Sequence, residues 1–206
     1  MKILCLGDSL IYGMGVLHKE RWSSLVAEQT GYTVVNRGIS GDTTGGMLAR
    51  FERDVLRQSP DIAVLLGGGN DMVSTGTDLT GKRARANLFA LLQQTMAAGI
   101  QPVLATPLPL DWQHVSPLWA PVTDFRQVDT VCRDYVQWIL RIGNAFRVPV
   151  ADFYHLFAAL PDFPGSWFVD GLHPGREGHK QMAALMTPLL QRTAETLRKK
   201  GGIPCE

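Results

Sequence analysis

Short apolar runs alternate with longer amphipathic stretches along this chain, and this alternation most constrains its fold. The apolar runs are typical of strands covered by helices on both faces, and they span residues 2–6, 33–36, 62–66, 102–106 and 148–151. Helical patterning spans residues 22–29, 44–58, 80–98, 122–146 and 175–199. This order predicts right-handed βαβ units. We expect an α/β fold, a three-layer α/β/α sandwich with a flavodoxin-like five-stranded parallel sheet.

The length of the chain and its charge limit the classes of protein to consider. A chain of 206 residues suits one domain, which we place at residues 1–200, with residues 201–206 as a frayed tail. With a net charge of +1, the chain lacks the excess of basic residues that is typical of proteins that bind nucleic acid. No apolar run approaches the ~20 residues that span a bilayer. We expect no nucleic-acid partner, no membrane span, and a monomer or homodimer.

The cysteines give an expectation about the compartment. Cys5, Cys132 and Cys205 are odd in number, and no pair has metal-ligand spacing, which argues against a disulfide framework. The first residues lead directly into a predicted strand and lack the long apolar core of a signal peptide. We therefore expect reduced thiols, no metal and a cytoplasmic location.

Polar, glycine-containing clusters follow the first three predicted strands, and another precedes the last helix. Because parallel strands end at a common edge, clusters remote in sequence can converge there. The clusters are Gly7-Asp8-Ser9-Leu10, Asn36 to Thr43, Gly67-Gly68-Gly69-Asn70-Asp71 and Asp170-Gly171-Leu172-His173-Pro174. Taken singly, each has an ordinary interpretation as a turn or a helix cap.

Together, the clusters contain the groups that acyl transfer requires. A serine such as Ser9 becomes nucleophilic when a base such as His173 removes its proton. Asp170, three residues earlier, can bond Nδ1 of that histidine and leave Nε2 free to face the serine. Gly41 can offer a backbone N–H and Asn70 an amide N–H to the oxyanion of the tetrahedral intermediate.

These four blocks, in this order, resemble the GDSL or SGNH hydrolase family. The resemblance implies that Ser9 is the nucleophile and lends its own N–H to the oxyanion hole, with Gly41 and Asn70 as the other donors. It implies His173 as the base, Asp170 as its orienting carboxylate, and no cofactor. The implied activity is that of an esterase, lipase-like enzyme, thioesterase or lysophospholipase. The block around Gly41 most resembles bacterial acyl-ester and thioester hydrolases.

A long irregular segment, residues 107–121, is where we expect a wall of the substrate site. Four aromatic residues in predicted loops are candidates for an apolar acyl pocket, and core packing explains them equally well: Trp112, Trp119, Trp167 and Phe168.

Two other functions are consistent with parts of the pattern. A metal-dependent phosphoesterase also gathers Asp, Asn and His side chains at strand ends, although no His-x-His or Asp-x-His pair occurs. A non-catalytic flavodoxin-like domain can bind a mononucleotide over its glycine loops, although no Gly-x-Gly-x-x-Gly follows a strand.

Overall fold

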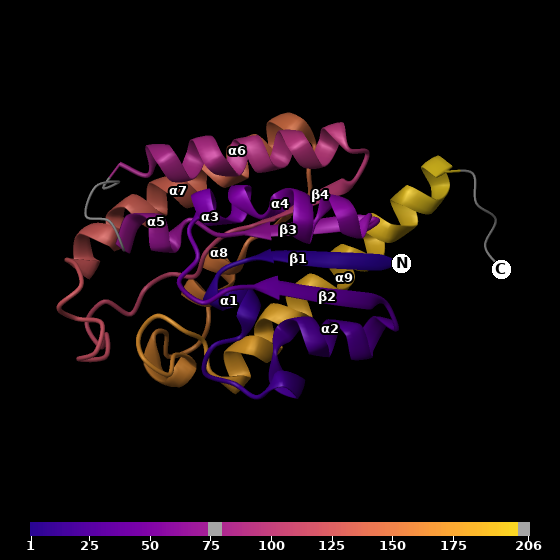
Figure 1. Ribbon diagram of the computed structural model, residues 1–206. Helices are drawn as coiled ribbons and strands as arrows, with labels where there is room; N and C mark the ends of the chain where they lie inside the picture. The colour runs from indigo at the N-terminus through magenta and orange to yellow at the C-terminus, as the bar shows by residue number, and fades with distance from the viewer. Residues whose placement is uncertain (74–79, 202–206) are drawn as a thin grey trace.

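The computed structural model describes residues 1–73 and 80–201, and a five-stranded parallel sheet lies at its centre (Figure 1). The strand order is β2-β1-β3-β4-β5. The strands are β1 (Lys2–Gly7), β2 (Thr33–Gly38), β3 (Ile62–Leu66), β4 (Gln101–Ala105) and β5 (Val150–Ala151). The predicted sheet is confirmed, and each strand end lies within two residues of its predicted position.

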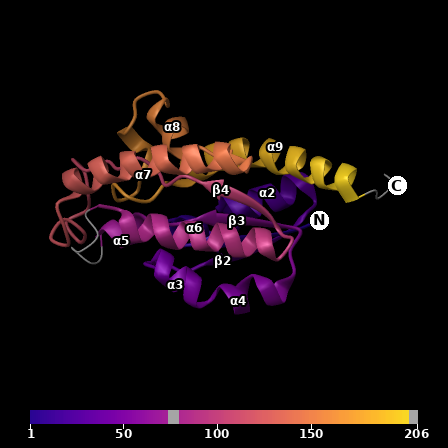
Figure 2. The same cartoon turned by 90° about the horizontal axis from the view of Figure 1, so that it is seen from above.

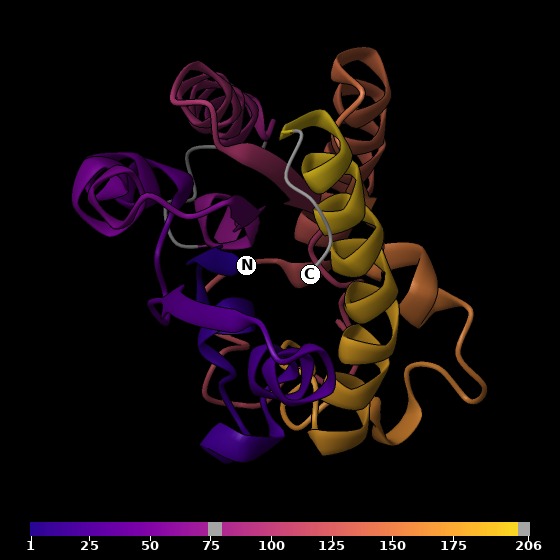
Figure 3. The same cartoon turned by 90° about the vertical axis from the view of Figure 1, so that its right-hand side faces the viewer.

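Helices cover both faces of the sheet, as the continuously apolar strands require (Figure 3). Ile3 and Cys5 face one core, which α1 (Ser9–Tyr12), α2 (Trp22–Thr30), α8 (Phe153–Ala158) and α9 (Arg176–Gly201) complete. Leu4 and Leu6 face the other core, which α3 (Thr44–Ala49), α4 (Phe51–Asp54), α6 (Lys82–Ala97) and α7 (Phe125–Phe146) complete. Alternate residues of a strand point to opposite faces, so one apolar run supplies both cores.

The predicted helix over residues 44–58 is wrong as a single element. The chain forms α3 and α4 and then the 3₁₀ turn η2 (Leu56–Gln58), with a break at Arg50, whose φ is −108° and ψ 3°. Arg50 is buried and donates hydrogen bonds to the backbone oxygens of Gly7 and Arg37. Periodicity alone could not reveal this break, because the apolar stripe continues through it.

Several short elements were not predicted. Besides α1 and α8, they are α5 (Gly69–Val73) and the 3₁₀ turns η1 (His18–Glu20) and η3 (Gly165–Trp167). A helix of four to six residues lacks the repeated apolar spacing that identifies longer helices. α1 and α5 matter most, since they directly follow β1 and β3.

The order of the strands creates a switch point between β1 and β3. After β1 the chain crosses to β2 on one side, whereas β3 and the later strands are added on the other side. Figures 1 and 2 show the strands pointing toward the end of the molecule that carries α1 and α5, with α6 and α7 running back in the opposite direction. In open α/β sheets the crevice at such a point is the usual ligand site.

The remaining expectations concern the termini and the thiols. Cys5 and Cys132 are buried and free, and burial raises the pKa of each thiol to about 12, while Cys205 lies outside the described residues. Of the predicted tail, only Gly201 is described, as the last residue of α9. Among the helices that the structure describes, none combines the length and apolarity needed to cross a bilayer. The single-domain assignment stays a prediction.

Candidate active site

Ser9 is the first residue of α1, immediately beyond the carboxyl end of β1. Asp8 caps this helix, and its Oδ1 accepts a 2.9 Å hydrogen bond from the Leu10 N–H. Gly7 permits the sharp transition, because a Cβ there would collide with the backbone oxygen of Leu66 on the neighbouring strand. The sequence prediction of Ser9 beyond the end of the strand is correct in place, although the serine begins a helix and not a loop.

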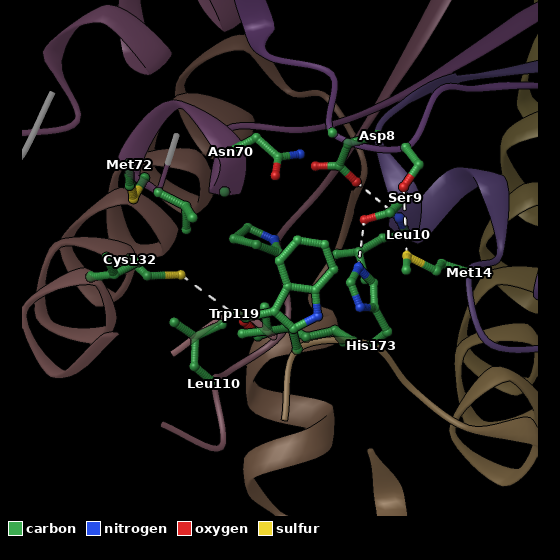
Figure 4. A pocket seen from close by; sticks show the side chains of 18 of the residues that line it. Asp8, Ser9, Leu10, Met14, Asn70, Met72, Leu110, Trp119, Cys132 and His173 are labelled. Atoms are coloured by element: carbon green, nitrogen blue, oxygen red, sulfur yellow. Dashed lines mark hydrogen bonds between the residues drawn. The ribbon is translucent and has the colours of Figure 1, made fainter. Parts of the chain in front are cut away.

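His173 joins Ser9 to Asp170 by two hydrogen bonds (Figure 4). Nε2 of His173 lies 2.9 Å from Ser9 Oγ, and Nδ1 lies 2.7 Å from Asp170 Oδ2. An Nδ1–H that donates to the carboxylate leaves Nε2 as the acceptor for the serine hydroxyl. Ser9 and His173 are 164 residues apart in sequence. Each is only 7% exposed, so their contact is shielded from water.

The Asp170 carboxylate accepts four hydrogen bonds. Oδ1 accepts from the backbone N–H groups of Leu172 and His173, at 3.0 and 2.8 Å. Oδ2 accepts from the His173 ring and from Trp119 Nε1, the latter at 3.0 Å. Burial disfavours ionisation of this carboxyl, but the bonds from His173 and Leu172 outweigh it and lower its pKa to about 2. Asp170 is therefore a carboxylate at neutral pH.

Asn70 and Gly41 line the same pocket as Ser9. Asn70 lies in α5 after β3, and its Nδ2 donates to the Asp42 backbone oxygen at 2.9 Å, which leaves its second amide N–H for another acceptor. Figure 4 shows the Asn70 amide and the Ser9 hydroxyl along one wall, with Asp8 between them in this view. Burial is the main cause that raises the pKa of Asp8 to about 6.

Buried ionic contacts hold the loop that carries Gly41. Arg50 forms hydrogen-bonded ion pairs with Asp42 at 2.8 Å and with Asp54 at 2.9 Å. Through its bond to the Gly7 oxygen, the same guanidinium also reaches the end of β1. The loop after β2 is thereby fixed relative to the segment that carries Ser9. The role of Arg50 was not predicted, although its position between the apolar residues Met47 and Phe51 of an amphipathic stretch was a visible signal.

An apolar pocket of about 330 Å³ opens beside the Ser9 hydroxyl. Its apolar lining comes from five separate segments and includes Met14, Met72, Leu110, Trp119, Val128, Cys132 and Leu172. Figure 4 shows Met72, Cys132 and Leu110 on the side opposite Ser9 and His173. Leu110 and Trp119 lie in residues 107–121, where a wall of the substrate site was expected, whereas the pocket positions of the other residues were not predicted. Apolar residues such as Met72, Val128 and Cys132 on helices are equally typical of a core.

Of the four aromatic residues predicted to line an acyl pocket, the structure places only Trp119 there. The other three predictions are wrong in position. Trp112 is 38% exposed and faces Arg126. Trp167 and Phe168 pack against the core between the sheet and α9, where Phe168 contacts the rings of Phe157 and Phe163.

No group of three or more His, Cys, Asp or Glu side chains is placed to hold a metal ion within residues 1–73 and 80–201.

His179 is fully buried, and its Nδ1 accepts a 3.2 Å hydrogen bond from the Trp22 N–H. Burial, with contributions from Arg21 and His173, lowers the pKa of His179 to about 4. It is therefore a neutral core histidine.

Several known proteins with similar sequences are named esterases or thioesterases. The profile of the GDSL-like lipase/acylhydrolase family matches residues 5–181. The chain is 30% identical to the esterase TesA of Pseudomonas aeruginosa over 107 residues, which is 50% of this chain and 52% of that protein. It is 29% identical to an acetylxylan esterase of Geobacillus stearothermophilus over 210 residues, covering 88% of this chain and 90% of the other.

The chain spans about half the length of the curated relatives that it matches at 30% identity. Among solved structures, a member of the lipolytic G-D-S-L family from Veillonella parvula superposes with a TM-score of 0.78 at 20% identity. That superposition covers 93% of this chain and 99% of the other. It supports the fold assigned above.

Proposed function

The chain belongs to the GDSL-like lipase/acylhydrolase family, and from that membership we propose that it hydrolyses carboxylic acyl esters through a Ser9–His173–Asp170 triad. The observation that carries the proposal is the continuous hydrogen-bonded path from Ser9 Oγ through the His173 ring to Asp170. This path ends at the mouth of an apolar pocket. This order of a hydroxyl, an imidazole and a carboxylate is the one that serine acyl transfer needs, and it supports the proposal.

In the proposed reaction, Ser9 Oγ attacks the ester carbonyl carbon while His173 Nε2 accepts the hydroxyl proton. The tetrahedral intermediate collapses when His173 returns that proton to the leaving alkoxide, which departs as the alcohol. Water, deprotonated by the same histidine, then attacks the acyl-enzyme and releases the carboxylic acid. Throughout, Asp170 remains ionised and stabilises the imidazolium.

Three N–H donors are proposed for the oxyanion. The Ser9 N–H is at the start of α1 and so has no partner within that helix. The Gly41 N–H comes from the loop after β2, and the second N–H of the Asn70 amide comes from α5, which follows β3. All three segments meet at the switch point between β1 and β3, where the oxyanion would form.

The pocket supports an apolar acyl group as the part of the substrate that is recognised. Its lining is mostly carbon and sulfur, whereas its polar groups cluster at the Ser9 end. An acyl chain can lie against Met72, Leu110 and Cys132 while its carbonyl rests at Ser9. The pocket lining does not select among leaving groups. A substrate panel should therefore include alkyl esters, acyl-thioesters and lysophospholipids.

The experiment that tests this function measures hydrolysis of a nitrophenyl acyl ester by Ser9→Ala and by Ser24→Ala. Ser24, whose hydroxyl donates to His18, lies outside the pocket and serves as the matched control. We expect Ser9→Ala to lower kcat by at least ~10³-fold and Ser24→Ala to leave it unchanged. Residual activity of Ser9→Ala close to that of the unmodified protein would rule out the proposed nucleophile.

The alternative of a metal-dependent phosphoesterase has a direct test in the same assay. We expect acyl-ester hydrolysis to survive exhaustive treatment with a chelator, because the proposed steps use side chains, backbone N–H groups and water, and no metal ion. Loss of activity on chelation, with recovery on adding a divalent cation, would instead support the metal mechanism. The cytoplasmic location and the monomeric or dimeric state stay predictions.

A further inference from the structure

Trp119 contacts Asp170 from a loop that is remote in sequence. Its Nε1–H donates to Oδ2 at 3.0 Å, across 51 residues of chain. Oδ2 is the same oxygen that accepts from His173 Nδ1. A carboxylate offers about four lone-pair sites, and the other three bonds to Asp170 come from its own short loop. Within residues 1–73 and 80–201, Trp119 therefore supplies the one side-chain hydrogen bond to this carboxylate that comes from outside the 170–173 loop.

The loop that carries Trp119 is docked against the loop of Asp170. The Asp111 N–H donates to the Gly171 oxygen at 3.0 Å, and the Ser116 N–H donates to the Asp170 oxygen at 2.9 Å. Gly171 has a φ of +84°, and a Cβ there would lie 2.8 Å from Val115 Cα. Only glycine permits this conformation with so close an approach. The backbone of each loop thus fixes the distance over which the indole reaches the carboxylate.

The indole also shields the bond that it restrains. Its ring centre lies 6.3 Å from that of His173, and the side chains of His173 and Asp170 are only 9% and 15% exposed. A hydrogen bond between a carboxylate and an imidazole is stronger when water is kept out. Trp119 meanwhile lines the acyl pocket. One side chain therefore touches both the proposed acyl site and the group that orients the base.

We propose that Trp119 is a positioning residue, whose indole N–H holds the Asp170 carboxylate in the orientation from which Oδ2 engages His173 Nδ1. This inference rests on the proposed function, because it assigns work to the proposed triad. A residue that only lines the pocket needs its apolar ring but not its N–H group. The proposed role of Trp119 depends on the N–H group and is therefore a separate one.

The test compares Trp119→Phe with Trp112→Phe on an acetyl ester, whose short acyl group keeps ring–substrate contact small. Trp112 belongs to the same loop but is exposed and does not line the pocket. We expect Trp119→Phe to lower kcat about tenfold with KM within about twofold, and Trp112→Phe to change neither.

A double-mutant cycle separates positioning from packing. In an Asp170→Ala background there is no carboxylate to hold, so adding Trp119→Phe should change kcat by less than about twofold. A tenfold loss in both backgrounds would show that the ring acts by packing and would overturn the proposal. An unchanged kcat in Trp119→Phe would overturn it as well.

If Trp119→Phe fails to fold, benzothienylalanine at position 119 replaces the N–H by sulfur in a ring of the same shape, with the same expected losses. Ser9→Ala is measured alongside. Full activity of Ser9→Ala would refute the proposed function itself. An inactive Ser9→Ala with no coupling between Trp119 and Asp170 would refute only the positioning role.

Discussion

Among individual residues, an aspartate is followed three positions later by a histidine at three places in the chain, and the three pairs differ in their surroundings. Asp111 and His114, Asp152 and His155, and Asp170 and His173 are each three residues apart, and in each pair the carboxylate lies within 3 Å of Nδ1. The side chains of His114 and His155 are 73% and 51% exposed, whereas that of His173 is 9% exposed and meets a serine. The spacing therefore produces the Asp–His pair, but only the tertiary fold brings a serine hydroxyl to one of the three pairs.

These pairs provide matched controls for the proposed base. We expect His173→Ala to lower kcat by at least ~10³-fold, because Nε2 of His173 lies 2.9 Å from Ser9 Oγ and is the proposed acceptor of its proton. His155→Ala removes an equally spaced imidazole from the surface and should leave kcat unchanged. Steady-state kinetics on a nitrophenyl ester checks both variants. Equal losses in the two variants would mean that the effect is structural.

His179 makes a prediction about stability and pH. Its pKa is lowered from 6.5 to about 4 in the folded protein, so between these values the unfolded chain binds more protons. The stability that depends on neutral His179 is complete above about pH 6.5. It is lost as the pH falls toward 4, by about 3 kcal/mol.

The variant His179→Asn can keep an acceptor for the Trp22 N–H but does not titrate. The gap in unfolding free energy between the unmodified protein and this variant should therefore narrow by up to about 3 kcal/mol from pH 7 to pH 4. Denaturant unfolding at the two pH values measures this gap. A gap that stays constant with pH would contradict the assignment of His179 as a buried neutral group.

At the scale of the element, the sequence predicted strands better than helices. Every strand was found because runs such as residues 62–66 are apolar throughout and end at glycine or a polar residue. The break at Arg50 was missed because it depends on partners in β1 and β2, which no local pattern reveals. The four motif blocks predicted the polar end of the site, whereas Trp112, Trp167 and Phe168 were placed wrongly because aromatic residues in loops pack in either direction.

Arg50 links elements that the site requires, and its removal should show this. Arg50→Met would leave the buried carboxylates of Asp42 and Asp54 without their shared partner. We expect a loss of about 3–5 kcal/mol in unfolding free energy. Arg53, which also pairs with Asp54 but is 68% exposed, is the control, and Arg53→Met should leave the melting temperature nearly unchanged. Similar melting temperatures for both variants would show that burial does not matter here.

The contribution of α7 to the pocket predicts how activity depends on acyl length. Each methylene buried against the pocket is worth about 0.8 kcal/mol, so kcat/KM should rise up to about fourfold per carbon until the pocket is full. Val128→Phe narrows the pocket from α7 and should shift the optimum to shorter chains. Thr130→Phe, on the exposed side of the same helix, should not. A flat series of nitrophenyl esters would contradict an acyl-binding role.

At the scale of the whole molecule, the site depends on the order of the strands. β1, β2 and β3 end at one edge of the sheet, so that the segments bearing Ser9, Gly41 and Asn70 converge there. His173 reaches the same edge from the loop before α9, which packs along one face of the sheet. Residues spread over most of the chain thus surround one position beside Ser9 Oγ.

The assignment of Ser9 as the nucleophile is tested most directly by covalent labelling with a fluorophosphonate. Mass spectrometry of the intact protein and of its peptides identifies the labelled residue. We expect one phosphonyl group per chain, attached to Ser9, and a loss of esterase activity in proportion to the labelling. The variant Ser9→Ala should take up no label. Label on any other residue, or full activity in protein labelled at Ser9, would contradict this assignment.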